Sequence, residues 1–221
     1  RTGGYPGWVP SCQLTQGLPQ TGGKKEIIKK HKALLLLEEG RRQLMLSFGT
    51  EMTVLERTEE EAVVETPLGK GIVRADEIGA LNERDGSGID FIKTGKAFLG
   101  LPYLWGGTSS FGYDCSGFTY SICRANGVLI PRDAHEQAAH GDYVPFSAVM
   151  PGDLLFFASE GGKGAVRHVG FYEGNGKMLH SPKTGKNIEI IGLTGSEYEK
   201  ELCCIRRYRR EGSSWKKYLS K

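Results

Sequence analysis

The sequence lacks long apolar runs: the longest uninterrupted stretches of apolar residues, 33–37 and 154–158, have five residues each. A membrane-spanning helix needs about 20 such residues, so we expect no membrane span. A large excess of one charge is also missing, because 29 Lys and Arg against 26 Asp and Glu leave a net charge of only +3. Dedicated nucleic-acid-binding domains usually carry a basic face, so we expect no nucleic-acid partner.

Phosphate-binding loops are absent as well. The chain contains neither Gly-x-x-x-x-Gly-Lys-Ser/Thr nor a Gly-x-Gly-x-x-Gly that opens a helix, and these are the motifs that hold nucleotide phosphates on backbone amides. We therefore expect no nucleotide chemistry and no cofactor.

The five cysteines form neither a disulfide framework nor paired zinc knuckles, so a reducing compartment fits them best. This favours a cytoplasmic location. A secreted or cell-wall-associated protein is the alternative, because residue 1 is Arg rather than Met and a natural N-terminus with an export signal is not excluded.

Two parts of the chain differ in pattern. Before the polar, glycine-bearing stretch 82–88, short β-prone segments alternate with turn residues, which is typical of a small β-barrel. Gly7-Trp8-Val9 resembles Gly71-Ile72-Val73 and indicates that the chain begins inside a first copy of the same module. The predicted divisions are 1–14 as the tail of a truncated first module, 15–32 as a linker, 33–81 as a barrel, 82–88 as a linker, 89–210 as a second domain and 211–221 as a C-terminal tail.

The second part begins with a 3.6-residue apolar repeat from Phe91 to Leu99, which predicts an amphipathic helix with a Ser87–Asp90 capping box at its start. A second helix is predicted to open at Cys115 and to end at Asn126. Strands are then expected over 154–157, 166–173, 177–181, 188–191 and 204–208. The fold class is α+β, with helices first and an antiparallel sheet after them.

Cys115 is singular among the cysteines because Asp114 precedes it as a candidate N-cap, which places the thiol in the first turn of a helix. A helix N-terminus beside an imidazolium lowers the pKa of a thiol from about 8.5 to roughly 3.5–7.5. The Asp114 carboxylate opposes this shift unless it points away and caps the helix. An inert buried cysteine is the competing interpretation.

His168 and His180 lie on opposite arms of a hairpin predicted around Gly174-Asn175-Gly176. A two-residue loop would put the two histidines on opposite faces of the sheet, whereas a three-residue loop would put them on one face, with Gly170 leaving room between them. A Cys–His–His site requires the second register. His168 would then take and return the proton of Cys115, and His180 would orient the His168 ring.

A three-ligand zinc site at Cys115, His168 and His180 is the main alternative use of these side chains. The sequence has no paired-ligand spacing, and the helix N-terminus already favours the sulfur anion. We therefore expect no metal.

The second part carries a series of short motifs in a fixed order. They are Pro102-Tyr103-Leu104-Trp105-Gly106-Gly107, Asp114-Cys115-Ser116-Gly117-Phe118, Pro131-Arg132, Pro151-Gly152-Asp153-Leu154, His168-Val169-Gly170 and His180. With these motifs the second part resembles the NlpC/p60 cell-wall peptidases over residues 89–210, and the first part resembles bacterial SH3-like barrels.

This resemblance implies a papain-like NlpC/p60 catalytic domain, with helices packed on an antiparallel sheet, preceded by a small SH3-like β-barrel. It also implies a cysteine peptidase that cleaves γ-D-glutamyl bonds in peptidoglycan stem peptides, most like the γ-D-glutamyl-L-diamino acid endopeptidases of murein-peptide recycling. Peptidoglycan-derived peptides are then the partners. Alternatives are wall remodelling on intact peptidoglycan, acyl transfer by the same residues, or a non-catalytic wall-binding protein. Oligomeric state is not predicted.

Residue by residue, the resemblance makes Cys115 the nucleophile, His168 the base and then the acid, and His180 the orienting residue. Tyr103 is implied as an oxyanion donor. Arg132 is expected either to contact a substrate carboxylate or to be a structural ion-pair partner, and the two alternatives stay open here. The expected substrate-binding residues are Tyr5, Trp105, Asp114, Ser116, Arg132 and Asp133.

Overall fold

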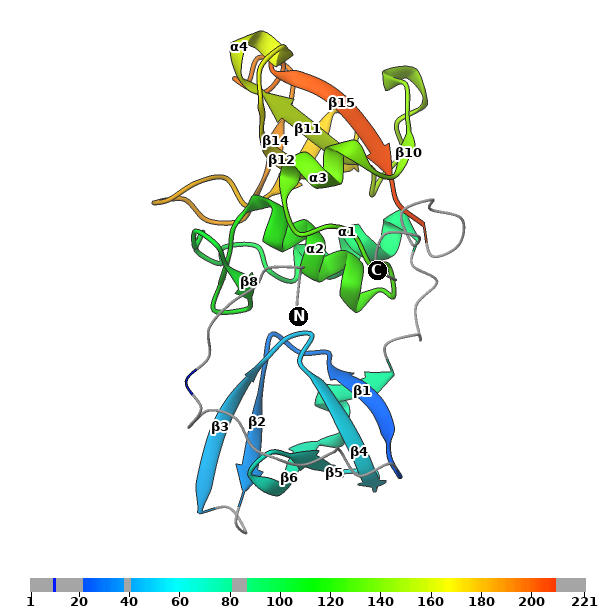
Figure 1. The fold of residues 1–221 in the computed structure, drawn as a ribbon, viewed down its shortest axis with the longest axis vertical. Helices are drawn as coiled ribbons and strands as arrows, with labels where there is room; N and C mark the ends of the chain where they lie inside the picture. The colour runs from blue at the N-terminus through cyan, green and yellow to red at the C-terminus, as the bar shows by residue number, and fades with distance from the viewer. Residues whose placement is uncertain (1–9, 11–21, 38–40, 81–86, 210–221) are drawn as a thin grey trace. The chain divides into compact units, whose positions relative to one another are not determined.

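The structure, a computed structural model, describes residue 10 and residues 22–37, 41–80 and 87–209. The chain divides into two compact units, 1–83 and 84–221. Among the described residues, Figure 1 shows strands and one 3₁₀ turn in the first unit and a mixture of α-helices and strands in the second. Within the described ranges, no helix is both long and apolar enough to cross a membrane.

The first unit is one antiparallel sheet with the strand order β3-β2-β6-β5-β4-β1-β7. The stretch 15–32, predicted as a linker, contains a strand, because β1 pairs with both β4 and β7 and buries Ile27 and Ile28. The strand has no alternating pattern in its sequence, because Lys24 and Lys25 at its start are exposed and the three residues after them are buried. The elements are β1 Lys24–Ile28, β2 Lys32–Leu37, β3 Arg42–Ser47, β4 Glu51–Arg57, β5 Glu61–Thr66, β6 Gly69–Arg74, the 3₁₀ turn η2 Ala75–Glu77 and β7 Ile78–Ala80.

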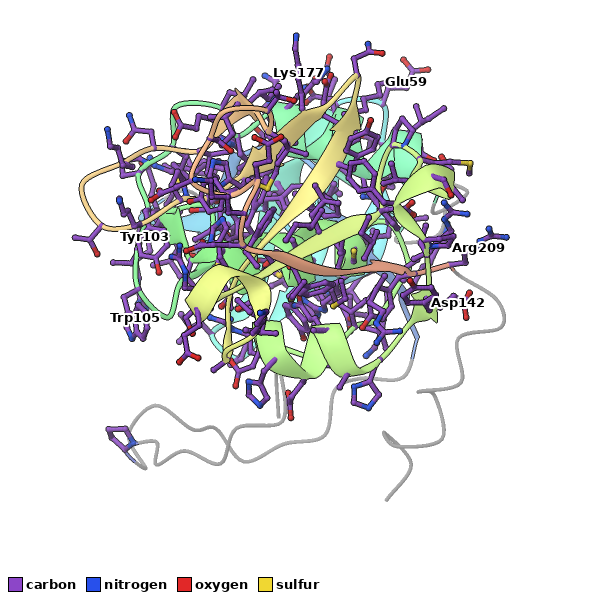
Figure 2. All side chains as sticks on the ribbon, turned by 90° about the horizontal axis from the view of Figure 1, so that it is seen from above. Glu59, Tyr103, Trp105, Asp142, Lys177 and Arg209 are labelled. Carbon is purple, nitrogen blue, oxygen red and sulfur yellow. The ribbon has the colours of Figure 1, made fainter. Side chains whose placement is uncertain are left out.

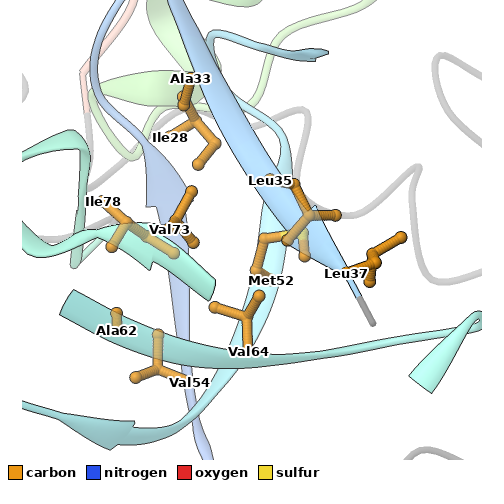
Figure 3. Packing of buried hydrophobic residues seen from close by; sticks show 10 residues of the cluster. All are labelled: Ile28, Ala33, Leu35, Leu37, Met52, Val54, Ala62, Val64, Val73 and Ile78. Carbon is orange, nitrogen blue, oxygen red and sulfur yellow. The ribbon is translucent and has the colours of Figure 1, made fainter. Parts of the chain in front are cut away.

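Alternate residues of these strands form the core of the first unit. In β2, Ala33, Leu35 and Leu37 are buried, while Leu34 and Lys32 face away. This period of two is what a half-buried strand requires. Figure 3 shows the cluster, which comprises Ile28, Ala33, Leu35, Leu37, Met52, Val54, Ala62, Val64, Val73 and Ile78.

The second unit places helices before a six-stranded antiparallel sheet with the order β10-β15-β11-β12-β13-β14, which confirms the α+β expectation. Each strand predicted here is present, and the helix α3 was not predicted. The elements are α1 Gly88–Lys96, β8 Thr108–Ser109, β9 Gly112–Tyr113, α2 Cys115–Ala125, α3 Ala134–Ala139, β10 Asp142–Tyr143, η3 Phe146–Ala148, β11 Leu154–Ala158, α4 Ser159–Gly162, β12 Val166–Gly174, β13 Lys177–His180, β14 Glu189–Gly192 and β15 Leu202–Arg207.

Helix α1 begins with the predicted capping box: the Ser87 side chain accepts from the Asp90 amide, and the Asp90 side chain accepts from the Ser87 amide. Two positions differ from the predicted pattern, in which Leu99 belongs to the apolar face of the helix and Thr94 to the opposite, polar face. Thr94 is buried because its hydroxyl contacts the Asn126 side chain at 3.2 Å. Leu99 is 45 % exposed because the helix ends at Lys96, before the repeat reaches it.

Helices α1 and α2 pack side by side against one face of the sheet (Figure 1). Phe171 of β12 meets Phe91 of α1 and Phe118 of α2, with ring centroids 5.9 and 6.0 Å apart. The other face of the sheet is also covered, by a cluster that includes Leu155, Phe157 and residues that follow β14. Both faces of the sheet are therefore covered by apolar side chains. Helix α2 packs directly on β12, the strand that carries His168.

Candidate active site

Cys115 is the first residue of α2, as predicted from the Asp114 N-cap. The Asp114 backbone is extended, and its side chain accepts a hydrogen bond of 2.6 Å from the Gly117 amide. A residue beginning a helix keeps its amide free of intrahelical bonds, so the α2 N-terminus directs donors at an anion. The Cys115 thiol therefore lies at the N-terminus of α2, close to backbone N–H groups that have no partner within the helix.

Arg132 donates hydrogen bonds to two side chains at the start of α2. Its guanidinium donates to the Asp114 carboxylate at 2.6 Å and to the Ser116 hydroxyl at 2.8 Å. The Arg132 and Asp114 side chains are only 8 % and 12 % exposed. Of the two roles left open for Arg132, the structure has the ion pair, and this residue is not part of the lining of the cavity in the described chain.

His168 and His180 face each other across β12 and β13. Their ring nitrogens, Nε2 of His168 and Nδ1 of His180, are 2.8 Å apart, and both residues are buried. The register that the site requires is present, since Phe171 pairs with Leu179.

The hairpin reaches this register by a route that differs from the three-residue loop we expected. Gly174 pairs with Lys177, so the loop is the two residues Asn175 and Gly176, both with positive φ, as in a type I′ turn. A bulge between Tyr172 and Gly174 then inserts one residue into β12. One extra residue exchanges the two faces of a strand, so the bulge restores the pairing of the histidines on one face.

Gly170 allows the two histidine-bearing strands to meet closely. A Cβ at this position would lie 2.6 Å from the Met178 sulfur and 2.9 Å from the His180 Cβ. No side chain tolerates such distances without a shift of β13, so glycine is required here by the room between the strands.

Tyr198 is a site residue that the sequence analysis missed. Its ring stacks on His168 with centroids 5.0 Å apart and lies edge-on to His180 at 5.2 Å. Tyr198 is 6 % exposed and also packs against Phe157. It belongs to the irregular segment after β14, where no periodic pattern distinguishes a residue that packs on the site from a residue at the surface. The face of the sheet that carries both histidines is therefore also packed by Phe157 and Tyr198.

A cavity of about 300 Å³ brings the candidate residues together. Tyr103 and Trp105 come from the segment before α2, and Trp105 is 84 % exposed at the surface, near Tyr103 in Figure 2. Asp133 and the start of α3 form a further part of the wall. Tyr5 lies outside the described residues. The lining is Tyr103, Trp105, Asp114, Cys115, Ser116, Asp133, Ala134, His135, Val166, Arg167, His168, Pro182, Lys183, Glu197 and Tyr198.

The resting thiol and imidazoles are uncharged. Burial raises the pKa of Cys115 to about 11, the Asp114 carboxylate adds to the rise, and the backbone amides of Ser116 and Val169 oppose it. This direction is opposite to the lowered pKa that we expected, because the thiol is buried and the Asp114 carboxylate is adjacent. Burial, followed by the neighbouring His180, holds the pKa of His168 well below its usual range, and burial lowers the pKa of His180 to about 4.

Burial also raises the pKa of Tyr103 to about 12, with further contributions from Cys115 and Asp114. The phenol therefore keeps its proton at neutral pH, so its hydroxyl is able to donate a hydrogen bond. In the described part of the chain, no three His, Cys, Asp or Glu side chains are grouped as metal ligands.

The sequence and the fold of this chain are similar to those of known proteins. The NlpC/P60 family matches residues 100–207. A gamma-D-glutamyl-L-lysine dipeptidyl-peptidase of Bacillus subtilis (strain 168) is 50 % identical over 204 residues, which are 92 % of this chain and 69 % of that protein. The chain belongs to the NlpC/P60 family.

Two further similarities support the assignment to the NlpC/P60 family. A relative of the same name from Bacillus cereus (strain ATCC 10987) is 39 % identical over 93 % of this chain and 65 % of its own length. The crystal structure of an NlpC/P60 family protein from Bacillus cereus ATCC 10987 superposes with a TM-score of 0.87 at 38 % identity, covering 93 % of this chain and 71 % of that one. This chain thus spans about two thirds of the length of these relatives.

Proposed function

We propose that the protein is a cysteine peptidase that hydrolyses the γ-D-glutamyl–diamino acid bond of peptidoglycan stem peptides, of the form L-Ala-γ-D-Glu-diamino acid. The observation that carries the proposal is the cavity lined by Cys115, at the start of α2, and by His168, whose ring contacts His180 through a nitrogen–nitrogen distance of 2.8 Å. The names of the two relatives that match along most of the chain support the bond and the substrate class.

The reaction begins from an uncharged thiol and imidazole. The Cys115 sulfur attacks the γ-carbonyl carbon while its proton passes to Nδ1 of His168, since Nε2 of that ring is engaged by His180. The tetrahedral oxyanion accepts hydrogen bonds from the Tyr103 hydroxyl and from a backbone amide at the α2 N-terminus, and one such donor contributes about 2.7–4 kcal/mol in other enzymes.

The intermediate then collapses with cleavage of the C–N bond. The leaving amine of the diamino acid takes the proton from His168, and the γ-glutamyl group stays on Cys115 as a thioester. Water attacks the thioester while giving a proton to His168, which returns it to the departing Cys115 sulfur. In each of the two steps His168 takes up one proton and gives one away, so the protons balance. The products are L-Ala-D-Glu and the free diamino acid.

The first residues of the substrate are assigned to two parts of the cavity wall, the segment before α2 and the residue before α3. The ammonium of L-Ala is assigned to the Asp133 carboxylate, which lines the cavity, and the Trp105 ring covers that end. The α-carboxylate of D-Glu is assigned to donors at Ser116 and the α2 N-terminus. Arg132 acts through Asp114 and Ser116 rather than by touching substrate.

The first unit, β1–β7, is proposed to be an SH3-like module, on the support of its short antiparallel strands and the Gly-Ile-Val strand β6. The cytoplasmic location expected from the cysteines also remains a proposal. Both concern how the peptidase meets its substrate rather than its chemistry.

The test is mass spectrometry after incubation with L-Ala-γ-D-Glu-L-Lys and with its N-acetylated form. We expect L-Ala-D-Glu and Lys from the free peptide, and no turnover by Cys115→Ala with a fold unchanged by circular dichroism. Retained hydrolysis in that variant would refute the nucleophile. Equal cleavage of the acetylated peptide would favour action on the intact wall, and products joined to an added amine would favour acyl transfer.

A further inference from the structure

His180 has a ring nitrogen that the Cys–His–His arrangement does not use. Its Nδ1 contacts His168, but its Nε2 is buried without a hydrogen-bond partner among the described residues. His180 is 1 % exposed. A buried N–H without a hydrogen-bond partner costs about 1–3 kcal/mol. Either this nitrogen therefore carries no proton, or a group near it accepts a hydrogen bond from its N–H.

One group near Nε2 is the carboxylate of Glu189. Residue 189 opens β14 and is the direct cross-strand partner of His180 on β13. Its Oε1 lies 3.8 Å from Nε2, and its side chain is 47 % exposed. This separation is longer than a direct hydrogen bond and within reach of a small side-chain rotation or one bridging water.

The position of the Nε2 proton decides which histidine nitrogen is basic. Between the two rings there is a single hydrogen bond, so one proton lies between them. If His180 carries its proton on Nε2, then His168 donates from its own Nε2 and leaves Nδ1 as the lone pair for Cys115. If His180 carries its proton on Nδ1 instead, His168 must hold a proton on Nδ1 and cannot act as the base.

We propose that Glu189 is a positioning residue of this site: its carboxylate accepts a hydrogen bond from Nε2–H of His180, directly or through one water, and thereby fixes the tautomer in which Nδ1 of His168 is free to deprotonate Cys115. A carboxylate disfavours a lone pair beside it and favours an N–H, which selects the productive tautomer. The inference rests on the function proposed above and adds a fourth member to the site.

The charge of Glu189 also acts during turnover. When His168 holds the proton of Cys115, positive charge is shared along the His168–His180 pair, and the carboxylate stabilises it. The other groups that face His180 are His168 from β12 and the Tyr198 ring. Arg167 acts on His168 with the opposite sign, and Glu197 lies beside Tyr198. Glu189 is the acidic group paired directly with the His180 position.

The experiment compares Glu189→Ala and Glu189→Gln with the wild type, by kinetics and by ¹⁵N NMR of the histidine rings. The amide oxygen of Gln still accepts a hydrogen bond from Nε2–H but carries no charge. We expect kcat to fall about tenfold in Glu189→Ala and about threefold in Glu189→Gln, small parts of the roughly 10²–10⁴ that proton transfer contributes, with KM within twofold. Glu173→Gln is the matched control, because Glu173 is a partly exposed carboxylate on β12 that pairs with Lys96 instead.

Two readouts separate positioning from a merely structural role. The acid limb of kcat/KM should move to lower pH in both Glu189 variants, since loss of the carboxylate makes the histidine pair harder to protonate. The NMR spectrum should show a protonated Nε2 on His180 in the wild type and in Glu189→Gln, and a mixture of tautomers in Glu189→Ala. An unmoved acid limb together with unchanged tautomers overturns the inference, whereas turnover by Cys115→Ala would overturn the proposed function itself.

Discussion

At the residue scale, the two histidines are neutral because they are buried, and this makes the stability of the fold depend on pH. Burial lowers the pKa of His180 to about 4 and holds the pKa of His168 well below its usual range. In the unfolded chain both rings titrate near 6.5. Above that value both states are neutral and the full stability is present; below it only the unfolded chain takes up protons, so stability falls as the pH falls.

We therefore expect the free energy of unfolding to decline below pH 6.5 by about 1.4 kcal/mol per pH unit for each ring, with the His180 part ending near pH 4. Urea unfolding between pH 7.5 and 4.5 measures this slope. His180→Gln should reduce it, while the exposed His135→Gln on α3 should not, since an exposed ring is hydrated in both states. Equal slopes in the wild type and His180→Gln would contradict the argument.

Local signals made several of these residues predictable. Asp114 caps α2 and Ser87 caps α1 because each bond involves residues within three positions of one another. Tyr198 and Glu189 were not predictable in the same way. Each reaches the histidines through strand pairing or loop packing, and neither has a sequence neighbour that marks it. The direction of the Cys115 pKa shift failed for the same reason, because burial is a property of the assembled site.

At the element scale, the β12–β13 pair depends on the absence of a side chain at residue 170. We expect Gly170→Ala to push β13 away from β12, because a Cβ would lie 2.9 Å from the backbone-fixed His180 Cβ. The overpacking should cost about 1–3 kcal/mol of stability and should lower kcat by lengthening the His168–His180 hydrogen bond. Urea unfolding and steady-state kinetics measure the two effects.

The matched control for this substitution is Gly192→Ala on the neighbouring strand β14, where an added Cβ would meet nothing within 4 Å. Gly192→Ala should leave both stability and kcat near the wild-type values. The close-approach argument fails if the two alanine variants behave alike.

Elements were predicted best where their pattern is local. The strands β11 to β15 were expected from apolar runs and turn residues, and α2 from its caps. Strand β1 was missed because its exposed half is lysine, and its partners β4 and β7 lie far along the chain. The bulge in β12 was missed because Glu173 carries no signal of one; only the pairing of both strands reveals it.

At the scale of the whole molecule, the two units have separate cores. Val64 of β5 is fully buried in the first, and Leu155 of β11 is fully buried in the second. We expect Val64→Ala to cost about 2 kcal/mol through lost contacts and a small cavity. Hydrogen exchange followed by mass spectrometry should show faster exchange in 24–80 and unchanged protection in 88–207.

Leu155→Ala is the reciprocal variant and should speed exchange in 88–207 alone. Faster exchange in β11–β13 of Val64→Ala would show instead that the units unfold together. The candidate site lies in the second unit, so its activity should not depend on the core of the first unit. In Val64→Ala we therefore expect kcat on the free tripeptide to stay near the wild-type value while the first unit loses protection.

The extra residue in β12 is confined to the turn end of the hairpin. Tyr172 pairs with Met178 and Gly174 pairs with Lys177, so Glu173 is the residue left out of the ladder. Deleting Glu173 would join these two pairs into a regular two-residue hairpin and would leave His180 opposite Gly170. Among chains that share this architecture, we therefore expect hairpins that lack the bulge residue to keep both histidines on one face of the sheet.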